Sequence, residues 1–299
     1  MKQTIHSLIV GPGAIGSLLC AHIQAHSTVW VHPHKPAMSL ANEVLSKESV
    51  PLNWQLLDNP QQPIDLIWVC SKANHSEQTA SKLLTLHNNA QAILLHNGLG
   101  PQQALNKKFP GRIIYGMTTN AAFKASNGLF QQTAFGQTFL GYPHQVAPQS
   151  AAWLETITSW PGNLSFYKVA NIESALWKKL AINAIVNPLT AFYQIKNGEL
   201  LKSQYQSTIN KMCKEIEQVA LKERQSLPTP LINTVNEVIE LTAQNYSSMN
   251  RDFHYKRTTE LEFILGFLLN RAQKHAIEIP TIEYWYQKID ALQMQCSED

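Results

Sequence analysis

The feature that most constrains the fold of this chain is a pattern that repeats through residues 4–112. An apolar run of strand length is followed by a turn and then by a longer amphipathic stretch. This alternation is typical of βαβ units, in which helices connect parallel strands. The strands are predicted at Thr4–Val10, Thr28–Val31, Ile64–Cys70, Ala90–Leu95 and Arg112–Tyr115. With helices after the first, third and fourth of these runs, the pattern predicts an α/β, Rossmann-like domain.

Residues 116–168 complete this first domain with shorter β-like segments in place of the βαβ repeat. Two short β-like pieces, Leu129–Ala134 and Gln137–Leu140, flank Phe135 and Gly136, and we expect them to form a β-hairpin. A helix at Ala151–Trp160 and a last strand at Leu164–Lys168 should follow. We therefore predict a nucleotide-binding domain over residues 1–168.

The rest of the chain, residues 169–299, is predicted to form an all-α domain. No strand pattern competes with the helical periodicity there. Pro188 lies inside the first helix and should kink it, because proline has no N–H to donate to the fourth residue before it. The helices are expected at Glu173–Tyr193, Glu199–Arg224, Leu231–Gln244, Thr258–His275 and Ile282–Gln293.

Composition places the chain among globular proteins. Hydrophobic residues make up 44% and charged residues 15% of the 299 residues, which argues against extensive disorder. A net charge of +3 is too small for a protein that tracks nucleic acid, but it suits a small anionic ligand. The apolar run Ile5–Val10 is too short for a signal peptide or a membrane span. The cysteines, Cys20, Cys70, Cys213 and Cys296, are too widely spaced for a zinc or disulfide framework, and they fit a cytoplasmic protein.

A glycine motif follows the first predicted strand and opens the first helix. In this context the pattern G-x-G-x-x-G is typical of dinucleotide binding, because the glycines allow a tight turn and a close approach of backbone N–H groups to a pyrophosphate. A plain glycine turn is the alternative. The motif residues are Gly11, Pro12, Gly13, Ala14, Ile15 and Gly16.

The segment after the second strand distinguishes NAD from NADP. An acidic residue there would bind the ribose hydroxyls of NAD, whereas basic residues suit the 2′-phosphate of NADP. This chain has His32, His34 and Lys35 and no acid in residues 31–35, which favours NADPH/NADP+. A polar loop with accidental histidines is the alternative, and two histidines alone do not make a metal site.

Polar side chains also follow two later strands. Lys72 comes after the third strand and Asn97 after the fourth. Ligands bind at the carboxyl ends of parallel strands, so Lys72 is a candidate for a phosphate or ribose contact. Asn97 is a candidate for the nicotinamide end or the substrate. Both are otherwise ordinary loop residues.

The first C-terminal helix carries an amine and two amides on one face. Lys179, Asn183 and Asn187 are four residues apart, and each step rises about 6 Å. A 2-keto acid needs a proton donor for its carbonyl oxygen and neutral groups for its carboxylate and hydroxyl, which this face supplies. A polar contact between helices, or a face open to solvent, is the alternative.

The chain resembles the ketopantoate reductases, also called 2-dehydropantoate 2-reductases, over nearly its whole length. The C-terminal matches are far more specific than the glycine loop. The matching segments are Gly11–Gly16, Lys72, His96–Gly100, and residues 118–122, 176–180, 183, 187–190, 197–200, 247–249 and 257–260.

The resemblance implies a role for individual residues. Lys179 matches the family's general acid, and Glu260 matches a carboxylate that contacts the substrate near its hydroxyl. From the sequence alone, Glu260 is an acid at a helix N-terminus that complements the helix dipole. The remaining substrate positions are Asn97, Asn183, Asn187 and Ser248, and the cofactor positions are Gly11, Gly13, Gly16, Lys72, Asn97 and Ala122.

One segment departs from the family pattern. Many members carry an arginine for the 2′-phosphate, where this chain has His34 and Lys35, and lysine lacks the two-pronged donor geometry of arginine. The preference for NADP is therefore less firmly implied than nicotinamide binding.

The activity implied is NADPH-dependent reduction of 2-dehydropantoate to pantoate, a step that supplies pantothenate and coenzyme A. The helical domain is expected to close over the substrate, and no metal is required because an ammonium group can polarise the carbonyl. Reduction of another branched 2-keto acid and a nucleotide-binding sensor without turnover are the alternatives. Composition does not distinguish a monomer from a homodimer.

Overall fold

The computed structural model describes residues 4–32, 40–125, 129–143, 151–162 and 164–298. The chain divides into two compact units. The first comprises Met1–His96 and Pro101–Ile172, and the second comprises Asn97–Gly100 and Glu173–Asp299. The short loop after the fourth predicted strand thus belongs to the second unit, although the strands around it belong to the first.

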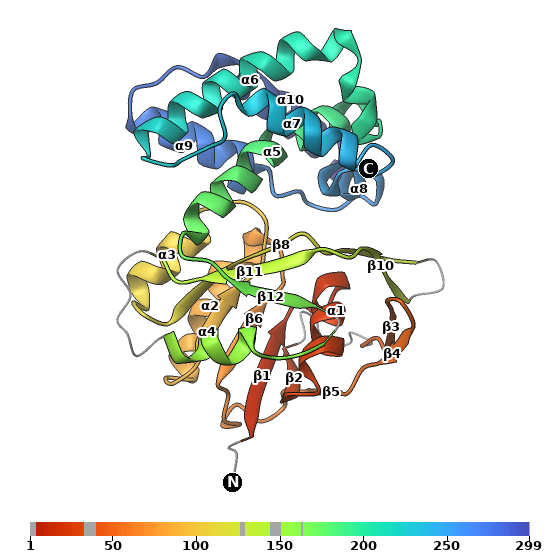
Figure 1. The fold of residues 1–299 in the computed structure, drawn as a ribbon, viewed down its shortest axis with the longest axis vertical. Coiled ribbons are helices and arrows are strands. Elements are labelled where there is room, and N and C mark those ends of the chain that lie inside the picture. The colour runs from red at the N-terminus through yellow and green to blue at the C-terminus, as the bar shows by residue number, and fades with distance from the viewer. Residues whose placement is uncertain (1–3, 33–39, 126–128, 144–150, 163, 299) are drawn as a thin grey trace. The chain divides into compact units, whose positions relative to one another are not determined.

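An eight-stranded sheet forms the centre of the first unit (Figure 1). Its strand order is β12-β11-β8-β7-β6-β1-β2-β5, and all neighbours are parallel except β8 and β11. β6 and β7 are buried along their whole length, as expected for strands covered on both faces. The strands are β1 (Ile5–Val10), β2 (Ser27–His32), β5 (Trp54–Leu56), β6 (Leu66–Val69), β7 (Gln91–Leu94), β8 (Ile113–Thr118), β11 (Gln137–Gly141) and β12 (Ser165–Lys168).

Within the described residues, four helices and a smaller sheet complete the first unit. The helices are α1 (Ala14–Ile23), α2 (Ala73–Leu86), α3 (Pro101–Lys108) and α4 (Ala151–Thr158). The second sheet has the order β4 (Ser49–Pro51), β3 (Glu43–Leu45), β10 (Phe130–Ala134) and β9 (Ala121–Lys124). β3, β4, β5 and β9 are only three or four residues long and mostly exposed or half-buried, so they leave no apolar run in the sequence.

The β-hairpin predicted around Phe135 and Gly136 is wrong. β10 pairs with β9 and β3 in the small sheet, whereas β11 pairs with β8 and β12 in the large one. The side chain of Asn120 holds the connection between them, because its Oδ1 accepts hydrogen bonds from the Gly136 N–H at 3.0 Å and from Gln132 Nε2 at 3.1 Å. A side-chain anchor therefore takes the place of the expected strand pairing.

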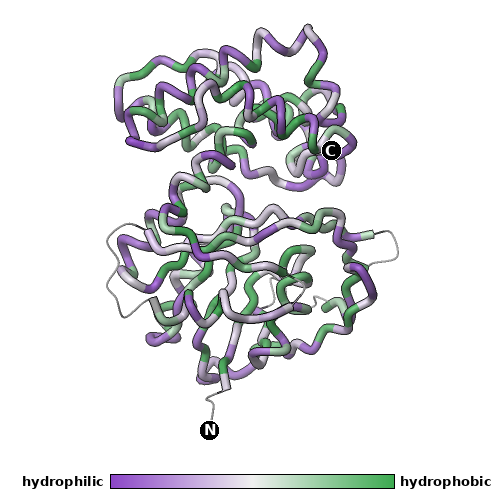
Figure 2. The backbone as a smooth tube through the Cα atoms, viewed as in Figure 1, coloured by the Kyte–Doolittle hydropathy of each residue, from purple (hydrophilic) through white to green (hydrophobic). Residues whose placement is uncertain are grey.

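The second unit is helical, and the α/β plus all-α fold class is confirmed (Figure 1). Hydrophobic and hydrophilic residues alternate along its helices, as amphipathic packing requires (Figure 2). No helix among the described residues has the length and apolar character needed to cross a membrane. The elements are α5 (Ile172–Tyr193), a 3₁₀-helix (Asn197–Leu201), α6 (Ser203–Lys222), α7 (Leu231–Leu241), α8 (Ser248–His254), a π-helix (Glu262–Gly266), α9 (Phe267–Lys274) and α10 (Pro280–Glu298).

Three details of the helical prediction are corrected. The single helix predicted at Glu199–Arg224 is interrupted, because Lys202 has an extended backbone with ψ of 142°. α8 was not expected. The helix predicted at Thr258–His275 begins only at Leu261, whose N–H donates to the Thr259 hydroxyl at 3.2 Å. α5 runs through Pro188, and the predicted kink stays a prediction.

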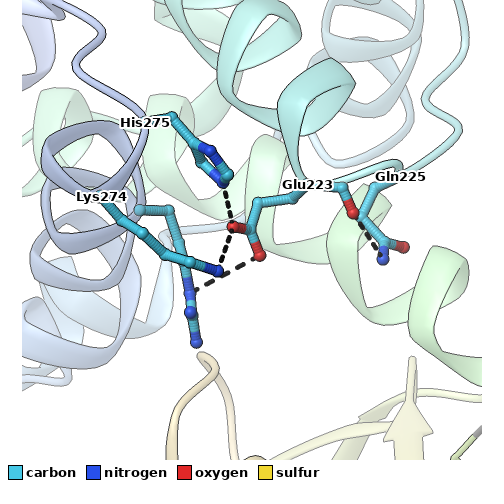
Figure 3. Close-up of polar contacts among 5 residues, drawn as sticks. Glu223, Gln225, Lys274 and His275 are labelled. Atoms are coloured by element: carbon cyan, nitrogen blue, oxygen red, sulfur yellow. Dashed lines mark hydrogen bonds and ion pairs between the residues drawn. The ribbon is translucent and has the colours of Figure 1, made fainter.

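A charged cluster joins the end of α6 to the end of α9 (Figure 3). Glu223 Oε1 accepts a hydrogen bond from His275 Nε2 at 2.5 Å and lies 3.4 Å from Lys274 Nζ, and its Oε2 lies 3.8 Å from Arg271 Nε. Burial raises the pKa of Glu223, but the His275 hydrogen bond and the two cations outweigh it and hold the pKa below its ordinary value. The cations also suit the C-terminal end of a helix dipole.

Candidate functional site

Three neighbouring strands end around the glycine loop of the first unit. Val10 at the end of β1 pairs with His32 in β2 and with Val69 in β6. The order of the sheet reverses at β1, since the chain continues to β2 on one side and returns to β6 on the other. Ligands of open α/β sheets bind beyond the carboxyl ends of the strands at such a switch point. The sheet therefore places the glycine loop where a ligand is expected.

The three glycines of the loop have different surroundings. Gly11 has φ of +85°, and an added Cβ would lie 2.6 Å from the backbone nitrogen of Ser71. At Gly16 an added Cβ would lie 2.5 Å from the Gly11 carbonyl oxygen. At Gly13 it would meet nothing within 4 Å. The first and third glycines thus allow close packing, while the second borders open space that can admit a ligand.

This edge of the sheet suits an anion. α1 begins after Gly13 and α2 begins after Lys72; neither N-terminal cap residue makes a side-chain capping bond to its own helix, and neither first turn contains an acid. Helix N-termini with these properties bind phosphates through their N–H groups. The hydroxyl of Ser71 is buried and has no hydrogen-bond partner among the described residues. The loop, two helix N-termini and this hydroxyl fit a dinucleotide pyrophosphate.

The remaining cofactor positions are less closely defined. Pro12 is buried, and the half-buried Ala14 and Ile15 open α1. Ala122 lies in β9, where it packs against the hydrophobic core, and its cofactor contact stays a prediction.

The residues expected to select NADP lie mostly outside the described structure. His32 is half-buried at the end of β2, next to the glycine loop in the register of the sheet. His34 and Lys35 lie outside the described residues.

α5 carries the polar face predicted in the second unit. Lys179 and Asn183 are half-buried, whereas Asn187 is buried, with an amide nitrogen that has no partner among the described residues. Lys178 is exposed. The polar face therefore runs from a half-buried lysine into the interior, which the alternative of a solvent face does not explain.

Burial controls the acidity of Lys179. It lowers the pKa of the ammonium group to about 8, and the negative charge of Glu260 opposes this shift. A lysine with a pKa near neutrality can release a proton during turnover and regain it from solvent. Lys179 thus has the acidity required of a general acid.

Glu260 lies two positions before the π-helix and is buried, with 7% of its surface exposed. Its Oε2 accepts a hydrogen bond of 2.9 Å from Asn97 Nδ2. The neighbouring Thr259 donates from its backbone nitrogen and its hydroxyl to Gln293 Oε1, at 2.9 and 2.7 Å. α10 therefore holds the residue next to Glu260, and the Glu260 carboxylate binds a residue that lies 163 positions earlier.

Ser248 is the first residue of α8 and is exposed, whereas its neighbour Ser247 is buried. Ser247 Oγ accepts hydrogen bonds from Thr190 Oγ1 at 2.8 Å and from the Asn250 N–H at 3.1 Å. Ser247 thus fixes the start of α8 to α5. The substrate contact predicted for Ser248 stays a prediction.

The second unit therefore gathers a proton donor, a carboxylate and neutral amides. Lys179 and Glu260 interact through their charges, and Asn97 binds Glu260 directly. Such a set can bind a polar carbonyl compound and protonate its oxygen. No group of three or more His, Cys, Asp or Glu side chains in the described ranges could hold a metal ion.

Sequence reasoning assigned no individual role to three residues that support these sites. Ser71 directly follows a buried strand at the ligand-binding edge, and Thr259 lies in the family-matching segment 257–260. The hydrogen bonds between Thr259 and Gln293 left no signal in the sequence, because they join residues 34 positions apart. The buried Cys20 and Cys213 and the half-buried Cys70 are free thiols, and burial raises the pKa of each to about 12.

A glycine loop that fits a pyrophosphate at a sheet switch point, followed by a helical unit with a half-buried lysine near a buried carboxylate, indicates a nicotinamide-dependent oxidoreductase with a Rossmann-like domain. Comparison with known families agrees. The model described as "Ketopantoate reductase PanE/ApbA" matches residues 7–145, and its C-terminal counterpart matches residues 171–293. The chain belongs to the ketopantoate reductase PanE/ApbA family.

Individual relatives cover nearly the whole chain. The 2-dehydropantoate 2-reductase of Vibrio cholerae is 32% identical, over 97% of this chain and 98% of its own. The probable 2-dehydropantoate 2-reductase of Bacillus subtilis has a TM-score of 0.81 at 24% identity, over 96% of this chain and 100% of its own. A D-mandelate dehydrogenase solved with NADH and anilino(oxo)acetate has a TM-score of 0.85 at 20% identity, over 98% of this chain and 100% of its own. These structural likenesses show the shared fold.

Proposed function

We propose that this protein reduces 2-dehydropantoate to pantoate with NADPH. The observation that carries the proposal is the group formed by Lys179, Glu260 and Asn97 in the second unit. The similarity to the 2-dehydropantoate 2-reductase of V. cholerae supports this choice of substrate.

The residues of the first unit would hold the cofactor. The open space at Gly13 and the buried Ser71 hydroxyl would receive the pyrophosphate, with Lys72 near the ribose or phosphates. His34 and Lys35 would bind the 2′-phosphate. NADPH, when bound, supplies the hydride for the keto carbon.

The residues of the second unit would act on the substrate. Lys179 donates the proton that the carbonyl oxygen takes up, and the neutral amine is then reprotonated from water. Glu260 accepts a hydrogen bond from the substrate hydroxyl, while Asn97, Asn183, Asn187 and Ser248 bind its other polar groups. The amide nitrogen of Asn187, which has no partner in the part of the chain that the structure describes, supports this role, because a buried donor without a partner is costly unless a ligand satisfies it.

The fold alone also accommodates other 2-keto acids. The D-mandelate dehydrogenase has a TM-score of 0.85, so a related acid with a different side chain is the second candidate. A homodimer remains compatible with either substrate and stays a prediction.

The test is the decay of NADPH absorbance at 340 nm with 2-dehydropantoate, compared with a panel of branched and aromatic 2-keto acids. We expect 2-dehydropantoate to have the highest kcat/KM. A higher value for benzoylformate, the keto acid that corresponds to mandelate, would assign the second candidate. If the protein bound NADPH but reduced none of these acids, it would be assigned as a nucleotide-binding sensor instead.

A further inference from the structure

The loop that carries Asn97 is attached to the π-helix of the second unit. The Leu99 N–H donates to the Phe263 carbonyl at 2.8 Å, and Phe263 lies within the π-helical segment Glu262–Gly266. π-Helix is rare and often occurs at functional sites. Asn97 in the same loop binds Glu260, the residue two positions before that segment. One short stretch of the second unit therefore contacts the loop through both backbone and side chain.

Gly98 lies at the closest point of this attachment. Its φ is +78°, and an added Cβ would lie 2.5 Å from the Phe263 carbonyl oxygen and 2.6 Å from the Phe263 Cβ. These distances are far below van der Waals contact, and the positive φ disfavours any other residue. A side chain at position 98 would push the loop away from the carbonyl that Leu99 binds.

Residues of α10 form hydrogen bonds with the π-helical segment and with the residues just before it. The Tyr286 hydroxyl donates a hydrogen bond to Glu262, and Gln293 accepts two from Thr259. Because these contacts fix the residues on both sides of Glu260, we expect the loop rather than the π-helix to shift when they clash.

We propose that Gly98 is a positioning residue: by lacking a side chain it docks the Asn97–Gly100 loop on the π-helix and so sets the contact between Asn97 and Glu260. This inference rests on the proposed function of Asn97 and Glu260 in substrate binding. Displacing a binding group by about 1 Å costs up to roughly 100-fold in rate, so the docking has a measurable consequence.

A double-mutant cycle tests whether Gly98 acts through Asn97. We expect Gly98→Ala and Asn97→Ala each to lower kcat/KM by roughly 10- to 100-fold, and the double variant to lie within about twofold of the worse single variant. Losses that multiply would overturn the proposal, because general destabilisation acts independently of Asn97. So would a Gly98→Ala enzyme of normal kcat/KM.

Gly100→Ala is the matched control. Gly100 also has a positive φ, +126°, but an added Cβ would come no closer than 3.7 Å to Phe263. The Gly100→Ala variant should have a lower Tm because of this backbone strain, but it should lose less kcat/KM than Gly98→Ala. Equal kinetic losses from the two alanines would mean that strain, and not docking, is responsible.

Two further measurements keep the test independent of folding and of the substrate. Replacing the Leu99 amide by an ester removes only the donor, and we expect it to reduce kcat/KM in the same direction as Gly98→Ala. Hydrogen exchange of the Leu99 amide needs no substrate: protection in the unmodified enzyme supports docking, and fast exchange overturns it. Failure of the proposed function would instead appear as an unmodified enzyme that does not reduce 2-dehydropantoate.

Discussion

The candidate cofactor site is formed mainly by backbone, whereas the candidate substrate site is formed by side chains. In the first unit, Gly11, Gly13 and Gly16 shape a short stretch of backbone between one strand and one helix. In the second, Lys179, Glu260 and Asn97 bring their side chains together from distant parts of the chain. The backbone site depends on space and the side-chain site on charge, so substitutions should affect them in different ways.

The largest effect is expected at Lys179. Lys179→Ala should lower kcat by roughly two to four orders of magnitude, because it removes the general acid, and it should still bind NADPH. Lys178→Ala is the control, since Lys178 is exposed and points about 100° away on the helix. Steady-state kinetics and NADPH titration measure both. Equal losses from the two variants would indicate general destabilisation.

The second largest effect on activity is expected at Glu260. Its carboxylate accepts a hydrogen bond from Asn97, and the Leu261 N–H at the start of the helix donates to the Thr259 hydroxyl. Loss of a cap costs about 1 kcal/mol of stability, whereas loss of one buried, charged hydrogen-bond partner costs about 2–5 kcal/mol of binding. Glu260→Ala should therefore keep its Tm within a few degrees and lose at least about 30-fold in kcat/KM. A near-normal kcat/KM would return Glu260 to a purely structural role.

The glycine loop should respond to added volume. Gly13→Val should fold normally because an added Cβ meets nothing within 4 Å, yet raise the KM for NADPH by roughly 10- to 100-fold by blocking hydrogen bonds to charged phosphates. Gly11→Val should instead lower the Tm, since Ser71 leaves no room. Thermal unfolding and cofactor KM separate the two, and an unchanged KM in Gly13→Val would remove the pyrophosphate from this position.

The smallest effect concerns the choice of cofactor. NADPH should be used better than NADH, and the variant with both His34→Ala and Lys35→Ala should narrow that gap by about tenfold, mainly through the KM for NADPH, since a lost charged contact is worth about 1.4 kcal/mol or more. The ratio of kcat/KM for the two cofactors measures it. Equal use of both by the unmodified enzyme would refute the 2′-phosphate assignment and leave the fold unaffected.

The contrast between a local backbone site and a site of side chains distant in sequence also explains what the sequence could predict. The glycine loop and the face shared by Lys179, Asn183 and Asn187 follow from local spacing, so they were accessible without a structure. The pairing of Asn97 with Glu260 spans 163 positions, and only the family resemblance indicated a role for Glu260. Local sequence patterns do not show which residues pair across such a separation in the sequence.

The errors in the fold have a related cause. The hairpin at Phe135 and Gly136 was inferred from two adjacent β-like segments, but Asn120 directs them into different sheets. The π-helix after Glu260 was missed because its residues have the apolar spacing of an ordinary helix. In the first case, hydrogen bonds from residues 12 and 16 positions away decided the outcome.

The most direct test of the central claim, that Lys179 donates the proton, is the pH dependence of kcat/KM. This parameter reports the groups of the free enzyme, in which burial lowers the pKa of Lys179 to about 8. Activity requires the ammonium form, so kcat/KM should fall as the pH rises through about 8, and this alkaline limb should be absent from the residual activity of Lys179→Ala. A limb that persists in Lys179→Ala would contradict the assignment.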